Sequence, residues 1–352
     1  MTTTTLADQL PGLSEGGRRL HLPVRVGLFA LTVVASLLLF ALTPLQGRGG
    51  FFAFVVLGYA VVQTGVSFAV EGRRHALDRL LSLFVHLALL AAIVPLVAVL
   101  YYTVVKGLKK LDGQFLTHNL QGLGPFDTNG GEYHAIIGTL EQVLMATVIA
   151  VPLGLLVAIY ITEYGRGWLA SAVRFVIDVM TGIPSIVAGL FIFAFWVIGL
   201  HQGYSGLAAA FALTILMLPV VVRASEEMIK LVPSELREAS YALGLPKWKT
   251  VLRVVLPTAS AGITTGAMLA VARVTGETAP LLLTSFITPG TNTSPVDGKQ
   301  AALPTFIFSQ IGLGRPVTYD RAWAAALTLI TIVLVLYISA RLLTRRNTLS
   351  RR

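Results

Sequence analysis

The chain has 352 residues, of which 55% are hydrophobic and 12% are charged, and its mean hydropathy is +0.77. Because a soluble domain usually carries about 25% charged residues, this composition excludes an ordinary soluble enzyme and favours a polytopic membrane protein. The net charge of +10 predicts basic loops on the cytoplasmic side of a membrane rather than a nucleic-acid surface. The absence of cysteine from the sequence excludes disulfides, thiolate metal sites and cysteine nucleophiles.

Residues 1–25 are polar and predict a cytoplasmic tail, because they lack the basic start of a cleavable signal peptide. A spanning helix needs about 20 mostly apolar residues. The runs that meet this length are, in chain order, Val26–Leu45, Phe51–Val70, Ser82–Val105, Ala135–Thr162, Ile183–Leu200, Gly206–Val222, Pro257–Phe286 and Ala322–Leu343. We therefore expect an all-α polytopic membrane protein with about eight transmembrane helices and a basic cytoplasmic tail over residues 344–352.

An even number of spans places both termini on one side of the membrane. If that side is the cytoplasm, the inner segments hold most of the 27 lysines and arginines, as the positive-inside rule requires. Arg273 lies within a span. The outer segments hold Arg48, Lys106, Lys109, Lys110, Lys299, Arg315 and Arg321. We expect both termini to be cytoplasmic.

Two outer loops, Lys106–His134 and Thr288–Asp320, are rich in glycine and small polar residues. This composition predicts irregular, solvent-exposed segments. They are either plain connections or a landing surface for an external partner, and the sequence leaves both interpretations open.

The long inner loop, residues 225–257, contains two helix signals separated by a glycine. Pro233 and Ser234 predict a helix start with Ser234 as the N-cap, and Ser234–Leu243 predicts a short helix. Gly244 suits its left-handed end, and Pro246 suits the start of a second short helix. We expect a helix–glycine–helix elbow; the alternative is an ordinary amphipathic loop lying on the membrane.

The same loop carries a spaced motif, made of Glu238-Ala239-Ser240, then Gly244, then Val254-Val255-Leu256-Pro257. It resembles the EAA loop of ABC importer membrane subunits, with Ser240 and Val254 as mild departures. In that family the loop docks in a cleft of the ATP-binding subunit. The resemblance implies that Glu238, Ala239 and Gly244 lie in this ATPase-coupling joint.

Two further stretches narrow the resemblance. Residues 182–191 read GIPSIVAGLF, and residues 272–282 read ARVTGETAPLL. Both are similar to phosphate ABC transporter permeases of the PstA type, which are type I ABC importer transmembrane subunits, and Thr278-Ala279-Pro280 favours the A-type over the C-type subunit. The resemblance implies a permease core over residues 82–343, with residues 26–70 as an additional transmembrane helix pair.

The resemblance also implies the partners and the location of the chain. They are a homologous PstC-type permease, a dimer of ATP-binding subunits and an external phosphate-binding protein, in the lipid of the cell (plasma or inner) membrane. No nucleic-acid partner is expected.

Arg273 and Glu277 are four residues apart, so we expect them to share a helix face inside the membrane. They are either a structural ion pair or, with Thr278, part of the pathway of an anionic substrate. Gly262 and Gly266 form a G-x-x-x-G pair, which permits close helix packing. Asp178 precedes the Gly182-Ile183-Pro184 break, which is either a kink or a helix start suited to an anion.

The sequence holds no Walker A motif, since its one Gly-Lys pair, Gly298-Lys299, is followed by Gln300. We expect a transport subunit that is no enzyme, with no catalytic residue, no metal site and no cofactor of its own, ATP being used by a partner subunit. The alternatives are a permease for another oxyanion such as sulfate or molybdate, a non-transporting membrane scaffold or signalling subunit, and an ion-gradient-driven carrier. The EAA-like loop argues against the carrier, which has no ATPase to dock.

Overall fold

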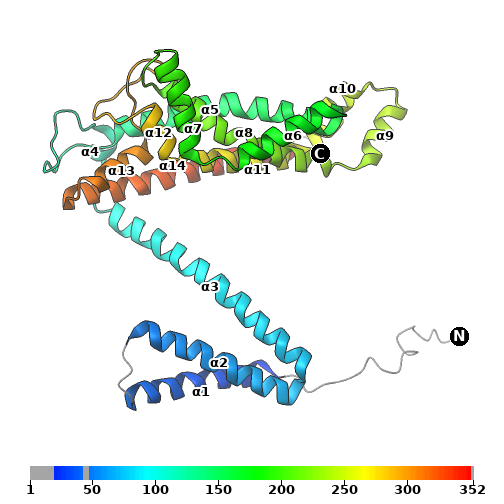
Figure 1. The fold of residues 1–352 in the computed structure, drawn as a ribbon, viewed down its shortest axis with the longest axis vertical. Helices are drawn as coiled ribbons and strands as arrows, with labels where there is room; N and C mark the ends of the chain where they lie inside the picture. The colour runs from blue at the N-terminus through cyan, green and yellow to red at the C-terminus, as the bar shows by residue number, and fades with distance from the viewer. Residues whose placement is uncertain (1–19, 43–46, 350–352) are drawn as a thin grey trace. The chain divides into compact units, whose positions relative to one another are not determined.

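A computed structural model describes residues 20–42 and 47–349, and every regular element in these ranges is helical. The chain divides into two compact units, Met1–Val99 and Leu100–Arg352, and α3 (Arg73–Gly107) belongs to both (Figure 1). The all-α fold is confirmed. Residues 1–19 of the predicted N-terminal tail lie outside the described residues. The predicted C-terminal tail, residues 344–352, begins as part of α14 (Pro316–Leu349). Residues 350–352 also lie outside the described residues.

In the first unit, α1 (Leu22–Leu42) and α2 (Arg48–Glu71) lie side by side as a hairpin (Figure 1). The buried side chains of the two helices are polar except for Val55, whereas most of the large apolar side chains are exposed. The buried set includes Thr32, Ser36, Gln63 and Ser67. This arrangement is typical of helices surrounded by lipid, where small residues allow close approach and hydroxyls bond within their own helix. The Ser36 hydroxyl, for example, donates to Thr32 O over 2.7 Å.

In the second unit, α8 is the central helix and packs against both α5 and α11. The long helices are α5 (Tyr133–Ile159), α8 (Gly206–Lys230), α11 (Leu256–Thr275) and α14. Gly262 and Gly266 of α11 face Met228 and Ala224 of α8 so closely that a Cβ at either glycine would collide with them. This confirms the close packing that the G-x-x-x-G pair predicts.

The two ends of the second unit differ. Figure 1 shows α9 and α10 at one end, called the elbow end below, and α4 and α13 at the other, called the loop end. Among the described residues, seven helices are long and apolar enough to span a membrane, and an eighth span exists if one bent pair counts as one. The expectation of about eight transmembrane helices is met in this sense.

The bent pair corrects one predicted span. The segment Ser185–Gly199 qualifies as a span only together with α6 (Trp168–Thr181), and the two meet at 106°. That segment consists of α7 (Ser185–Ile192) and η3 (Phe193–Gly199). The cause is Pro184, whose extended backbone (ψ 141°) interrupts the helix.

The predicted run Pro257–Phe286 is also divided. The helix α11 ends at Thr275, and a short helix, α12 (Ala279–Thr284), follows after a turn. Gly276 is the C-cap of α11, and Pro280, which lacks a backbone N–H, stands where a continuous helix would need one.

The two outer loops are more ordered than predicted. The first contains α4 (Gly113–Thr117) with Phe115 fully buried, and the second contains α13 (Leu303–Gly312) with Leu303 and Phe306 buried. The prediction of wholly irregular, exposed loops is therefore wrong. Apolar residues three apart, such as Leu303 and Phe306, give one helix face that packs into the loop end.

Glu132, directly before α5, is a buried carboxyl group at the loop end. It has no exposed surface, and neither oxygen makes a hydrogen bond of normal geometry with a described residue. Burial raises the pKa of Glu132 to about 7, and the nearby Thr328 hydroxyl offsets only part of this shift. Because the unfolded chain releases this proton near the ordinary value of 4.5, ionisation of Glu132 costs the folded state roughly 3 kcal/mol.

This shift predicts a pH dependence of stability. The folded state binds the proton more tightly than the unfolded state, so stability should fall as the pH rises from about 4.5 to about 7 and then level off. The Glu132→Gln variant lacks this proton and should lose less stability across that interval. Thermal unfolding of both purified proteins at pH 5 and pH 8 measures the difference; equal losses would contradict the assignment.

Candidate functional site

The elbow predicted from the inner loop is present. The helix α9 (Ser234–Ala242) and the short helix α10 (Lys247–Thr250) are separated by Gly244, whose φ is 75°. The helix α9 begins at Ser234, the first residue of the predicted range, and α10 begins one residue after Pro246. Pro233 and Pro246 keep an extended backbone and occupy the two N-cap positions. Ser234 is therefore the first residue of α9 and not its cap.

The bend at Gly244 is fixed by bonds across the elbow. The Leu245 N–H donates to Ser240 O over 3.2 Å. The buried Ser240 and Thr250 hydroxyls lie 2.8 Å apart, which joins α9 directly to α10. Ser240, which departs from the second alanine of the EAA pattern, thus supplies a bond that alanine lacks. The positive φ at Gly244 is a conformation that other residues adopt only with strain.

The outer surface of the elbow is open. Glu238 and Ala239 are exposed, and the apolar side chains of Leu243 and Trp248 are 81% and 56% exposed. Exposed large apolar side chains such as Leu243 and Trp248 are typical of a surface that another protein covers.

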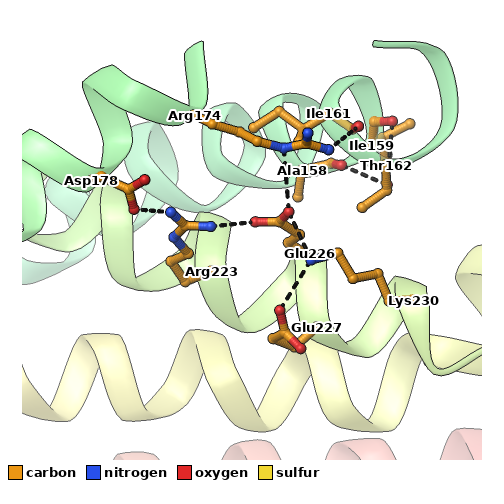
Figure 2. A network of polar contacts seen from close by, with 10 residues as sticks. All are labelled: Ala158, Ile159, Ile161, Thr162, Arg174, Asp178, Arg223, Glu226, Glu227 and Lys230. Carbon is orange, nitrogen blue, oxygen red and sulfur yellow. Dashed lines mark hydrogen bonds and ion pairs between the residues drawn. The ribbon is translucent and has the colours of Figure 1, made fainter. Parts of the chain in front are cut away.

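A polar network joins α6 to the elbow end of α8, as Figure 2 shows. Its centre is the Glu226 carboxylate, which is 1% exposed. Arg223 donates to it over 2.9 Å, Lys230 lies 3.0 Å away, and Arg174 of α6 lies 3.7 Å away. Arg174 also donates to Ile161 O over 3.1 Å, so the network reaches the segment after α5.

Asp178 takes part in this network through an ion pair with Arg223. It is therefore a structural partner of a cation and not part of a free anion site at the Pro184 break. Glu226 is not among the residues predicted from the sequence. The spacing of Arg223, Glu226 and Lys230, three and four residues apart, does indicate ion pairs on one helix face.

Arg273 and Glu277 do not share a helix face. The helix α11 ends between them at Thr275, and Glu277 lies in the turn, where its N–H donates to Val274 O over 3.1 Å. No ion pair joins the two residues in the described structure. The interpretation of a mutual ion pair is wrong, because Gly276 ends the helix one turn too early.

The three predicted pathway residues remain close in the chain and reach the surface of the unit. Arg273 is exposed, Glu277 is half-buried, and Thr278 is the N-cap residue of α12. Neither charged side chain has a hydrogen bond or ion pair with a described residue. A bare cation at the end of a spanning helix is costly in lipid and favours a position on an aqueous path or against another chain.

The two motif stretches of residues 182–191 and 272–282 meet in space. The helices α7 and α12 are in contact, and a Cβ on Gly189 would lie 2.6 Å from Pro280 Cα. Gly189 is needed here because only a residue without a side chain allows this approach. The helix that follows the break after α6 therefore packs on the helix that follows the break after α11.

Comparison with known proteins gives this arrangement a family. Residues 150–349 match the family described as binding-protein-dependent transport system inner membrane component. The phosphate transport system permease protein PstA 1 of Mycobacterium tuberculosis is 44% identical over 282 residues, which cover 79% of this chain and 92% of that protein. The chain belongs to the PstA family of permeases. The PstA permease protein of Yersinia pestis is 42% identical over 250 residues, covering 70% of this chain and 83% of that protein.

The fold of this PstA-family chain also resembles a solved structure. A chain of the bacterial alginate ABC transporter, solved in complex with an alginate pentasaccharide-bound periplasmic protein, superposes with a TM-score of 0.55. The match covers 76% of this chain and 95% of that chain at 18% identity, so it shows a common fold. With the spans described above, the PstA family assignment makes the chain an inner-membrane protein.

The Glu226 network predicts unequal effects at neighbouring glutamates. Glu226→Gln should lower the stability of the folded chain by about 2 kcal/mol, because three cations lose their shared anion. Glu227→Gln is the matched control: its side chain is 63% exposed and pairs with Lys230 alone, so it should cost less than about 1 kcal/mol. Denaturant unfolding of the purified chain compares them, and equal losses would refute the central role of Glu226.

Proposed function

We propose that the chain is the transmembrane permease subunit of an ATP-driven importer of inorganic phosphate and forms part of its translocation pathway. The observation that carries the proposal is the exposed helix–glycine–helix elbow in a member of the PstA family. The names of its relatives favour phosphate over sulfate or molybdate, and they do not favour a non-transporting scaffold or signalling subunit. Uptake of labelled phosphate by vesicles with the complete complex, with and without ATP and with sulfate as competitor, tests it.

The elbow is the proposed docking site of the ATP-binding subunit. The exposed Glu238 and Ala239 with Gly244 would enter a cleft of that subunit, and Leu243 and Trp248 would supply apolar contact area. ATP is then held by the partner dimer, and this chain acts as a transport subunit with no cofactor and no ATPase site. A homologous PstC-type permease and an external phosphate-binding protein complete the proposed complex.

This assembly implies an orientation. The elbow would face the cytoplasm, where ATP is available, and the loop end would face outward toward the phosphate-binding protein. Both termini are then cytoplasmic, which agrees with the excess of lysine and arginine in the inner segments.

Arg273, Glu277 and Thr278 are the proposed pathway residues. The unpartnered guanidinium of Arg273 can offer two parallel hydrogen bonds to phosphate oxygens. Hydrogen phosphate carries a proton that an ionised carboxylate such as Glu277 can accept in a hydrogen bond, whereas fully ionised sulfate has none. Thr278, the N-cap residue of α12, follows Glu277 directly and adds a hydroxyl to the group. The group therefore combines attraction for an oxyanion with a preference for the protonated one.

The pathway assignment predicts distinct effects of two substitutions. Arg273→Ala should abolish phosphate uptake, because the cation that compensates the anion is lost. Glu277→Gln should keep assembly and transport but lose part of the preference for phosphate over sulfate. Competitive uptake in vesicles, with the binding protein at saturation, measures both. Parental transport by Arg273→Ala would mean that the anion passes elsewhere.

The elbow assignment predicts a coupling defect at Gly244. A Cβ there has no other atom within 4 Å, but the φ of 75° should strain a valine by about 1–2 kcal/mol and shift the angle between α9 and α10. Gly244→Val should insert normally but lose ATP-driven uptake. The control is Gly65→Val, which also has open space around it but an ordinary helical backbone. Normal uptake by Gly244→Val would count against the coupling role.

A further inference from the structure

The polar bonds of the elbow converge on one residue from a distant part of the chain. The Arg237 guanidinium of α9 donates to Glu163 Oε1 from Nε over 3.1 Å and from Nη2 over 3.0 Å. Lys247, the first residue of α10, donates to the backbone carbonyl of the same Glu163, and its Nζ lies 5.1 Å from the centre of the Tyr164 ring. Both helices of the elbow are therefore bonded to residues 163 and 164.

These contacts are shielded from water, which strengthens them. The side chain of Glu163 is 7% exposed and that of Arg237 is 20% exposed. The guanidinium also donates to Ile229 O over 2.9 Å and to Val232 O, so it joins the end of α8 to the same point. A charge-assisted, many-branched contact of this kind fixes an orientation as well as a distance.

Glu163 belongs to the helical extension of α5. The segment η2 (Tyr160–Tyr164) continues α5 without a break, because the backbone at Tyr160 is helical (φ −57°, ψ −53°). Together they form one helix of 32 residues, about 48 Å long at 1.5 Å per residue. The chain itself joins the elbow to α8 and to η4–α11 (Val251–Thr275), but it does not join the elbow to α5. Among the described residues, the elbow is bonded to this extension of α5 through the carboxylate and the backbone carbonyl of Glu163 and through the Tyr164 ring.

The loop end of the same helix is bonded to another distant segment, residues 300–303. Gln142 donates to Gln300 Oε1 over 3.1 Å, and Gln300 donates to Glu141 over 2.5 Å. The Leu303 N–H donates to the Thr139 hydroxyl over 2.7 Å. This segment leads into α13, whose first residue is Leu303, in the part of the chain that follows the proposed pathway residues.

We propose that Glu163 is a positioning residue that makes the elbow and α5 move as one rigid body, so that α5 transmits a displacement of the elbow to residues 300–303 at the loop end. The inference rests on the proposed function, because an ATPase docked on the elbow supplies the displacement. Glu163 touches no substrate, and its carboxylate acts through Arg237; the bond from Lys247 goes to the backbone carbonyl, which an alanine at this position keeps. Its loss leaves the elbow itself intact, since the bond between Ser240 and Thr250 does not involve it.

The first test measures phosphate transported per ATP hydrolysed by the complete complex. In Glu163→Ala, binding of the ATP-binding subunit and ATP hydrolysis should persist, while phosphate transported per ATP should fall about tenfold, as the loss of a charge-assisted hydrogen bond allows. Glu227→Ala removes an equal charge from the exposed surface of α8 and should keep the parental ratio. A parental ratio in Glu163→Ala would overturn the proposal.

A second variant, Arg237→Lys, keeps the proposal testable if the Glu163→Ala complex does not assemble. Arg237→Lys keeps the positive charge but lacks the guanidinium that reaches Glu163 and the carbonyls of Ile229 and Val232 together. It should lower the same ratio, and a parental ratio in Arg237→Lys would overturn the proposal even if Glu163→Ala did not assemble. If the parental complex moves no phosphate at all, the proposed function fails instead, and the rigid-body claim is then decided by distance measurement.

The chain has no cysteine, so a cysteine introduced at a chosen position can be labelled specifically. Spin labels at Glu235→Cys in α9 and Leu156→Cys in α5, both exposed positions, report the distance between the elbow and α5. In the assembled complex the distance should be the same without nucleotide and with ATP bound. With Glu163→Ala added, it should change or broaden on ATP binding. A distance that changes in the parental complex would show that the elbow moves independently of α5 and would overturn the proposal.

Discussion

Inside a lipid bilayer every backbone N–H and C=O must find its partner within the protein, so a chain can leave the helical conformation only where other protein covers the break. This constraint explains the most irregular part of the structure. The helices break at residues 182–184 and 276–278, and the helices that follow, α7 and α12, pack on each other through Gly189 and Pro280. The second break places Glu277 and Thr278 in the turn directly after α11, and Arg273 in the last turn of that helix.

The charges of the second unit follow the same constraint in two different ways. At the elbow end, Glu226 and Glu163 are buried, and each is matched by cations that also bond to backbone carbonyls. Near the end of α11, Arg273 and Glu277 have no partner among the described residues. The contrast agrees with the proposal that a substrate or another chain provides the partner of Arg273 and Glu277.

The features predicted correctly from the sequence have local causes. Hydropathy alone identifies the long spans, and the prolines and glycine of residues 233–246 determine the elbow, because φ restrictions act within a few residues. The end of α11 differs from the prediction because apolar residues resume at Ala279, only a few positions after Val274, so the run was taken as one span although the backbone breaks at Gly276. The outer loops were mispredicted because a few buried apolar residues, such as Phe115 and Phe306, outweigh many small polar ones.

The features that the sequence did not reveal are contacts between distant segments. Glu163 is 74 positions from Arg237, and no pattern within either segment indicates the other. The Glu226 cluster is partly local and partly tertiary. Arg223 and Glu226 are neighbours on α8 and can be found from their spacing, whereas Arg174 comes from α6. Tertiary contacts of this kind depend on how helices are arranged, which a single sequence specifies only through the packing of its small residues.

A helix that transmits displacement must resist bending, yet α5 contains a proline, Pro152, in its interior. Proline removes one backbone hydrogen bond and favours a kink. The residues around it, however, are the small ones at which α5 touches α8: Ala146 and Ala150 are fully buried, and a Cβ at Gly154 would lie 2.7 Å from a methyl carbon of Val221. Bending at Pro152 would separate these surfaces along the most extensive helix contact of the unit. The proline therefore sets the shape of α5, and the packing on α8 keeps that shape fixed while the bonds at its two ends connect the elbow with the loop end.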